Sequence, residues 1–573
     1  MKTSIPRDVF PVIVACWILG TANSYLRAAP APIPDRLQWW AEARLGMFIH
    51  WGPVSLKETE ISWSRANTNP KCPNRGEIPA DVYDNLYRHF NPTNFNAEEW
   101  VATAKAAGMK YMVLTAKHGD GFLLWDSKLD NYNIMHTPFK RDVCGELARA
   151  AHAQGMRIGW YFSPMDWRDP DCRTDNNDRF VAKMHGELRE LLTHYGKIDL
   201  LWFDCDGREA PWNQATTYAL VKKLQPEIII NNRLDMGLND NPGLVQNLKP
   251  NADYFTPEQQ VGGFDDQHPW ESCMTISRRG QWSWGGPTDG VKSLAQVMEM
   301  LIGCAGGDGN MLLNVGPRPT GEIDREQSER VREIGEWLAK YGESIYSTRG
   351  GPFKPGAYGA STRRGKTVYL HILDWDNDAI ELPSIPGKVL RRRVLTGDQA
   401  EVSTTPHGLR ISLPERERQQ LDTVIALEFD RDVLEIAAVD VPLPKSLSTG
   451  AKATASNIFQ GQPQHGPDKA IDGRNDTRWA TDAGVHSAWL EINLGRPCTF
   501  RRATIRQGLP ELQRIRRFAI EYLQDSQWKA CYQGTNPGAK VVANFRPITA
   551  QKVRLNIAES TDGPTISEFQ LFE

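Results

Sequence analysis

One short stretch ends in a carboxylate that could act as a nucleophile. Residues 197–207 read KIDLLWFDCDG, in which the apolar run from Ile198 to Phe203 stops at Asp204 and a turn follows that ends in Gly207. This pattern is typical of a buried parallel strand that delivers an acid to the rim of an α/β barrel. The alternative is that Asp204 only caps the next helix.

Covalent catalysis by Asp204 needs a second carboxylate as general acid and base. Two candidates lie downstream, Glu258 in YFTPEQQ and Glu271 in PWESC, and either could lie on a loop opposite Asp204. An Asp–Glu pair among Trp and His residues is typical of a retaining glycosidase, whose two carboxyl groups lie about 5–5.5 Å apart. The alternative is that one of the two only forms a structural ion pair with Arg233 or Arg278.

Other polar and aromatic residues follow further expected strands. A lone His is more often a core residue, but side chains at the ends of successive barrel strands converge in space. These positions therefore predict one site. The residues are His50, Trp51, Lys117, His118, Asp120, Tyr161, Trp202 and Arg233.

Apolar strands alternate with helix-like segments between residues 38 and 347. Repeated strand–loop–helix units predict an α/β fold with a (β/α)8-like TIM barrel. Asn96 and Asp142 are predicted N-caps of two of its helices, which end near Gly108 and Gly155. The expected strands cover residues 46–49, 111–114, 157–162, 199–203, 228–230 and 310–313.

The helical pattern stops after Thr348, and short alternating strands in residues 348–438 predict a β-sandwich. Residues 439–449, VDVPLPKSLST, have the composition of a linker. Residues 450–573 again predict an all-β domain, with a different set of motifs. A chain of 573 residues is expected to divide in this way.

The N-terminus has the features of an export signal. Lys2 and Arg7 precede an apolar run over residues 9–20 that is too short to span a bilayer, and cleavage is expected near Ser24. Residues 1–24 therefore predict export to the periplasm or outside the cell, where a Cys498–Cys531 disulfide is conceivable. Sixty-seven Lys and Arg against 70 Asp and Glu give no indication of a nucleic-acid partner.

Five motifs lie in order along the chain: RLGMFIHWG at 44–52, KHGDGF at 117–122, LWFD at 201–204, NNR at 231–233 and GNMLLNVGP at 309–317. Together they resemble the α-L-fucosidases of glycoside hydrolase family 29, over residues 38 to 430. The resemblance implies a retaining hydrolase of fucosylated glycans that needs no cofactor for catalysis, with Asp204 as nucleophile. It also implies a fucose pocket in which His and Arg orient hydroxyl groups and an aromatic wall faces the C5 methyl group. The implied pocket residues are His50, His118, Tyr161, Trp202 and Arg233.

The resemblance favours Glu258 as the acid/base because it follows an Asp-aromatic pair, while Glu271 matches another recurring Trp-Glu. Two departures from the family pattern concern the substrate. Many members have Lys-His-His-Asp-Gly-Phe, but Gly119 replaces the second His here, so one hydroxyl contact is expected to be absent. Many carry Ala-Glu-Trp-Tyr after the first strand, and Glu60 and Trp63 are the nearest equivalents. Both changes bear on the linkage and the leaving group.

The last domain resembles a discoidin, or factor V/VIII C-type, module similar to carbohydrate-binding module family 32. Its motifs include KAIDG at 469–473, DTRW at 476–479 and the closing EFQLF. The resemblance implies a structural Ca²⁺, for which oxygen ligands are available; the alternative is a hydrogen-bonded turn. The implied ligands are Asp472, Asp476, Thr477 and Glu568.

Two other functions remain possible on this reasoning. One is a glycan-binding protein whose barrel lacks catalysis, against which the retention of Asp204 and two candidate acids argues. The other is a retaining hydrolase of a fucose-like sugar such as galactose. The aromatic wall around the C5 methyl group would decide between fucose and such a sugar.

Overall fold

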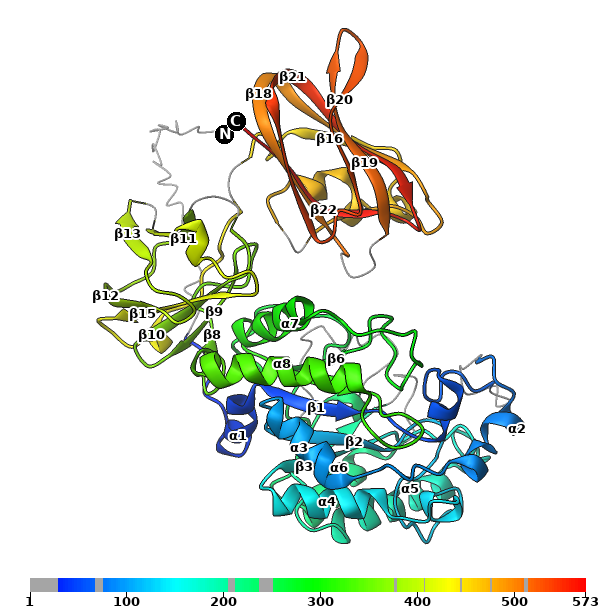
Figure 1. Ribbon diagram of the computed structural model, residues 1–573. Coiled ribbons are helices and arrows are strands. Elements are labelled where there is room, and N and C mark those ends of the chain that lie inside the picture. Colours follow the sequence, from blue (N-terminus) through cyan, green and yellow to red (C-terminus); the bar gives the residue numbers. More distant parts are fainter. Residues whose placement is uncertain are drawn as a thin grey trace, which may run out of the picture.

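The computed structural model describes three parts that follow one another along the chain: a helix-covered parallel sheet, a β-sandwich and a C-terminal β-domain (Figure 1). The predicted signal, residues 1–24, lies outside the described residues. No helix within them is both long and apolar enough to cross a bilayer. The described residues are 29–66, 76–204, 212–235, 251–375, 379–406, 408–443, 446–474, 477–509 and 514–573.

The first part contains seven parallel strands in the order β5-β4-β3-β2-β1-β7-β6. They are β1 (Leu45–Ile49), β2 (Tyr111–Lys117), β3 (Arg157–Phe162), β4 (Leu200–Phe203), β5 (Ile229–Ile230), β6 (Glu271–Thr275) and β7 (Asn310–Val315). The helices are α1 (Asp35–Ala43), α2 (Ala80–Tyr83), α3 (Ala97–Ala106), α4 (Val143–Ala153), α5 (Asn177–Thr193), α6 (Gln214–Leu224), α7 (Leu294–Gly306) and α8 (Arg325–Tyr341).

Two predicted caps are confirmed in this part. The Asn96 side chain accepts a hydrogen bond from the Glu99 amide at the start of α3, and Asp142 accepts from the Gly145 amide at the start of α4. Each cap satisfies an amide that has no partner within its helix. The local sequence thus sets where these two helices begin.

An extended segment, residues 254–258, fills the gap between β5 and β6. It forms isolated parallel bridges from Tyr254 to Asn231, from Phe255 to Trp270 and from Glu258 to Cys273. The segment takes the place of an eighth barrel strand, and Pro257 lacks the amide hydrogen that a regular ladder would need. The predicted TIM-like barrel is therefore confirmed, with seven regular strands and an irregular eighth position.

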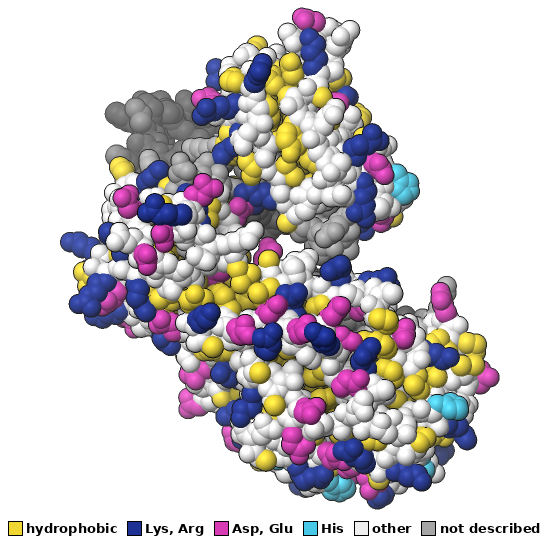
Figure 2. Space-filling model, viewed as in Figure 1, with side chains coloured by type: hydrophobic (Ala, Val, Ile, Leu, Met, Phe, Trp, Pro, Cys, Tyr) yellow, Lys and Arg dark blue, Asp and Glu magenta, His cyan; other side chains and the backbone are white. Residues whose placement is uncertain are grey.

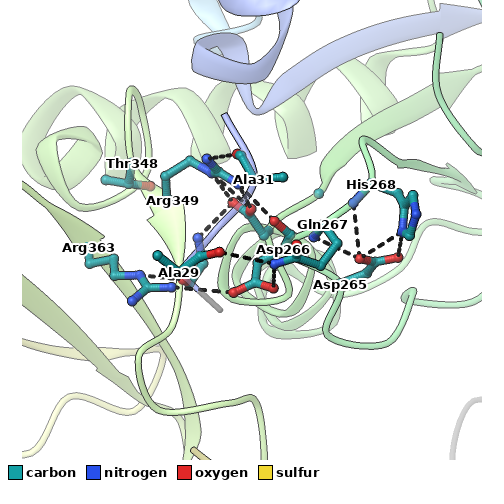
Figure 3. Close-up of polar contacts among 12 residues, drawn as sticks. Ala29, Ala31, Asp265, Asp266, Gln267, His268, Thr348, Arg349 and Arg363 are labelled. Carbon is teal, nitrogen blue, oxygen red and sulfur yellow. Dashed lines mark hydrogen bonds and ion pairs between the residues drawn. The ribbon is translucent and has the colours of Figure 1, made fainter. Parts of the chain in front are cut away.

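The amino end of the barrel carries a buried ionic network that also holds the N-terminal segment. Asp308 pairs with Arg44 at 2.8 Å and with Arg349 at 2.7 Å. Arg349 donates to the Ala31 carbonyl at 2.8 Å, and the Ala31 amide donates to the Asp266 carbonyl at 2.9 Å (Figure 3). This network ties the chain before α1 to the start of the sandwich, on the barrel face that serves stability.

The second part is a sandwich of a five-stranded sheet, β12-β15-β10-β9-β8, and a three-stranded sheet, β11-β14-β13. Its core is apolar and includes Phe353, Leu370, Ile411 and Leu427. The β-sandwich prediction is confirmed. The strands are β8 (Arg349–Gly350), β9 (Gly359–Arg364), β10 (Thr367–Ile372), β11 (Ala379–Pro383), β12 (Val389–Val394), β13 (Glu401–Thr405), β14 (Gly408–Ser412) and β15 (Thr423–Phe429).

The C-terminal domain has its own core and lies beside the sandwich, to which Asp374 links it by ion pairs with Lys540 at 2.6 Å and Arg506 at 3.2 Å (Figure 1). The disulfide between Cys498 and Cys531 is not formed, because both are free thiols. The strands are β16 (Lys452–Ala455), β17 (Trp479–Ala480), β18 (Ala488–Gln507), β19 (Ile515–Gln524), β20 (Gln527–Thr535), β21 (Lys540–Ser560) and β22 (Thr565–Phe572).

Charges of both signs alternate over the visible face of the molecule, with no extended basic area (Figure 2). This distribution agrees with the formal net charge of −3.

Candidate active site

Asp204 follows β4 directly, at the carboxyl end of the parallel sheet where the loops converge. One carboxylate oxygen accepts a hydrogen bond from the Tyr161 hydroxyl at 2.8 Å, and the other accepts from Arg233 Nη1 at 2.9 Å. The side chain remains 27% exposed. Asp204 is therefore fixed in orientation and open to a ligand.

Arg233 links Asp204 to a second carboxylate. Its Nη2 lies 2.7 Å from Oε2 of Glu258, while Nε and Nη2 also donate to the hydroxyl and the carbonyl of Thr256. The guanidinium lies over the Trp202 ring, 4.4 Å from the centroid. One buried cation thus brings two partly exposed carboxylates together, which a purely structural ion pair between Arg233 and a single acid would not do.

Aromatic and imidazole rings form the wall next to Asp204. His118 stacks on Tyr161 with 5.1 Å between centroids, and Tyr161 stacks on Trp202 at 5.5 Å. His50 lies 5.3 Å from Tyr161 and 4.8 Å from Trp282. Four predicted residues and one unpredicted residue therefore form one cluster of packed rings beside Asp204.

Both histidines of the wall are neutral near pH 7. Burial lowers the pKa of His118 to about 3, and burial together with the charge of neighbouring His118 lowers the pKa of His50 well below 6.5. The Asn314 amide donates to the Trp282 carbonyl at 2.6 Å, so its oxygen faces His50 Nδ1 at 2.7 Å. His50 then carries its proton on Nδ1 and presents Nε2 as an acceptor.

The segment after β1 contacts the same cluster of rings through the hydrogen bond between Glu60 and Trp282. Glu60 accepts hydrogen bonds from the amides of Trp282 at 2.8 Å and Ile61 at 3.1 Å. Burial raises the pKa of Glu60 to about 7, and the negative charge of Glu258 adds to this shift. Glu60 therefore lies within electrostatic reach of Glu258.

Ser62 and Asp120 hold His118 in place. Ser62 Oγ lies 2.6 Å from His118 Nδ1 and accepts the Asp120 amide at 2.8 Å. The Asp120 carboxylate accepts from the Tyr83 hydroxyl at 2.7 Å, and burial raises its pKa to about 6. Asp120 thus supports the loop rather than facing the pocket.

Three predicted site residues lie away from the Asp204–Glu258 pair. Trp51 packs in the outer core against Phe90 and Trp100. Lys117 is buried between the sheet and α5, where it pairs with Glu187 at 2.8 Å.

Glu271 is the third. It is the first residue of β6, aligned with Asn310 at the start of β7, and so lies at the amino end of the barrel. There it is 0% exposed and accepts hydrogen bonds from Trp40 and Tyr111. The sequence does not predict β6, because ESCMT lacks a long apolar run. Without this strand the loop after it is not recognised as a strand-end loop, so Trp282 is not among the predicted site residues.

The C-terminal domain brings together three of the four predicted calcium ligands. Thr477 Oγ1 lies 2.9 Å from both Asp472 carboxylate oxygens, and Glu568 Oε1 accepts the Gly473 amide at 2.8 Å. Asp476 lies outside the described residues. Over the described chain no cluster of three or more His, Cys, Asp or Glu side chains could hold a metal.

The α-L-fucosidase family model matches residues 27–343, and the F5/8 type C domain model matches residues 452–569. The chain belongs to the α-L-fucosidase family. It is therefore a glycoside hydrolase, with a discoidin domain at its C-terminus.

Individual relatives agree with this family. The tissue α-L-fucosidase of Homo sapiens is 30% identical over 441 residues, covering 69% of this chain and 91% of that protein. Among solved structures, α-L-fucosidase isoenzyme 1 from Paenibacillus thiaminolyticus has a TM-score of 0.61 at 33% identity, over 69% of this chain and 99% of that one. An α-L-fucosidase from Vibrio sp. strain EJY3, only 20% identical, shares the fold over 94% of both chains with a TM-score of 0.61.

Proposed function

We propose that the protein is an exported retaining α-L-fucosidase that removes terminal α-L-fucosyl residues from glycans. The observation that carries this proposal is the shared contact of Asp204 and Glu258 with Arg233 at the carboxyl end of the barrel. Two carboxylates bound to one guanidinium are close enough for covalent catalysis, in which the pair is separated by about 5–5.5 Å.

In the first step Asp204 attacks the anomeric carbon while Glu258 donates its proton to the departing glycosidic oxygen. A fucosyl ester of Asp204 forms and the bond to the leaving sugar breaks. In the second step Glu258 removes a proton from water, which attacks the same carbon and releases Asp204 with net retention. Tyr161 and Arg233 hold Asp204 in line, and the cation offsets its negative charge.

The retaining mechanism also draws support from a relative. A family 29 α-L-fucosidase from Bacteroides thetaiotaomicron, 27% identical over 70% of this chain, was trapped as a covalent intermediate with 2-fluoro-fucosyl fluoride. In the present chain we assign such a bond to Asp204, whose partly exposed carboxylate supports this role.

The pocket wall favours fucose over galactose. Phe48 lies between Trp202, at 5.3 Å, and Trp282, at 6.0 Å, so apolar faces surround the space beside His50. A C5 methyl group can lie against such rings without loss, whereas the hydroxymethyl group of galactose would bury a hydroxyl without a partner. The neutral His50 and His118 are suited to bind sugar hydroxyls.

We also propose that the turn around Asp472 binds a calcium ion. Glu568 Oε2 is buried without a hydrogen-bond partner, and burial raises the pKa of Glu568 to about 8, with the charge of Asp472 adding to the shift. A hard cation would satisfy such oxygens. Asp472, Thr477 and Glu568 would hold it, and its role would be to fix this turn of the discoidin domain, which in turn would keep the enzyme close to its glycans.

The test uses the purified full chain with 4-nitrophenyl α-L-fucoside and the matching α-galactoside. We expect the fucoside to be hydrolysed with an α-configured product, and Asp204→Ala to be inactive but rescued by azide. Glu258→Ala should lose more activity on a fucosylated oligosaccharide than on the aryl fucoside, because a good leaving group needs little protonation. Preference for the galactoside, or glycan binding without hydrolysis of any fucoside, would overturn the proposal.

A further inference from the structure

Gly119 departs from the family motif, and its surroundings show what occupies the space. A Cβ atom built on Gly119 would come within 3.3 Å of Trp167 Cε2 and 3.4 Å of Cζ2. The backbone angle φ of Gly119 is not positive, so conformational freedom does not require glycine here. The missing side chain instead makes room for the Trp167 indole, and the backbone amide of Trp167 donates to the Gly119 carbonyl at 2.8 Å.

Trp167 in turn supports an exposed aromatic ring. Trp63 meets Trp167 edge to face, with centroids 5.1 Å apart. Trp167 is buried, whereas Trp63 is 45% exposed and is one of few large apolar side chains in the described chain with so much open surface. An exposed indole fixed by a buried one is a rigid apolar platform. We call Trp63 and Trp167 the aromatic corner.

The aromatic corner adjoins the residues around Asp204 through Ser62 and His118. Trp63 directly follows Ser62, which contacts His118, and Ser62 has a left-handed backbone with φ of 57° that fixes the course of the segment. Glu60 lies in the same segment, and the negative charge of Glu258 contributes to the raised pKa of Glu60. Since Glu258 is the proposed proton donor to the glycosidic oxygen, a platform in this segment is suited to contact the sugar attached to that oxygen.

We propose that the aromatic corner is the binding subsite for the pyranose ring to which fucose is attached. The apolar C–H face of that ring stacks on the open face of Trp63, and Gly119 is the adaptation that admits the supporting Trp167. This proposal rests on the proposed fucosidase activity. It makes the aromatic corner a determinant of specificity for the sugar that leaves.

The test compares two substrates that differ only in the leaving group. α-L-Fucosyl fluoride has no leaving ring, whereas a fucosyl-galactose disaccharide does. For Trp63→Ala we expect kcat/KM on the disaccharide to fall by at least about tenfold more than on the fluoride, mostly through KM. Trp63→Phe, which keeps a ring, should restore most of the loss. Gly119→His, whose side chain would displace Trp167, should show the same selective loss.

Leu129→Ala is the matched control, because Leu129 is also 45% exposed and lies against Gly186 of α5, on another segment of the barrel. It should behave as wild type on both substrates. Equal losses of Trp63→Ala on both substrates, or no loss on either, would overturn the subsite. Failure of the wild type to hydrolyse the fluoride would instead overturn the fucosidase proposal.

Discussion

Replacing Glu271 by Gln separates the two candidate acids and tests the electrostatics of the barrel interior. Glu271 Oε2 accepts hydrogen bonds from Trp40 and Tyr111, while Oε1 is buried without a partner. Burial raises the pKa of Glu271 from its ordinary value of 4.5 to about 7. Between these values the folded protein binds more protons than the unfolded chain, so stability is full at low pH and is lost as the pH rises.

The size of this loss follows from the shift. One pKa unit corresponds to about 1.4 kcal/mol, so the ionised carboxylate lowers the free energy of unfolding by roughly 3 kcal/mol at pH 8 relative to pH 4. Gln keeps an acceptor for Tyr111 and Trp40 but does not titrate. We therefore compare the melting temperature of Glu271→Gln with that of wild type at pH 8 and at pH 4.5. The difference, variant minus wild type, should be about 5 °C larger at pH 8 than at pH 4.5.

Scanning calorimetry of the full chain at the two pH values measures this difference, and hydrolysis of a fucosylated oligosaccharide measures catalysis. Glu271→Gln should retain most of its activity, whereas Glu258→Gln should lose it. A variant whose melting temperature depends on pH as in wild type would refute the argument about burial. An inactive Glu271→Gln that melts normally would return Glu271 to the list of catalytic acids.

Three further variants test the site and the amino face of the barrel. Arg233→Met removes the cation shared by two carboxylates, and kcat/KM on the aryl fucoside should fall by about 10²–10³-fold, which a normal rate would contradict. Glu60→Gln should remove an ionisation near pH 7 from the pH profile of kcat/KM, because the pKa of Glu60 is about 7 and its charge acts on Glu258; an unchanged profile would exclude that coupling. Asp308→Asn leaves Arg44 and Arg349 without their anion and should destabilise the protein by about 3–5 kcal/mol in denaturant unfolding. Since the charge of Arg44 lowers the pKa of Asp308 despite burial, wild type should lose this contribution as the pH falls below 3.8, and a variant as stable as wild type would refute the role of the network.

The sequence by itself determined the features that depend on local patterns. The apolar run before Asp204 predicts a strand that ends in an acid, and Asn96 and Asp142 begin their helices as capping residues, because strand propensity and capping act over a few neighbouring residues. The change from helical to alternating patterns after Thr348 likewise predicts the two β-domains.

Only the tertiary structure shows how far apart Glu258 and Glu271 lie in the barrel. Both follow Pro or aromatic residues in short polar segments, and no local signal distinguishes them. The register of the barrel does: Glu258 is aligned with Cys273, inside β6, and reaches Arg233, whereas Glu271 begins β6 at the opposite end. The same holds for Trp63 and Trp167, which are about a hundred residues apart in the sequence but meet edge to face, with Trp167 lying against Gly119. A sequence pattern reports which face of its own segment is buried, but the neighbours across that face are set by how the strands align around the barrel.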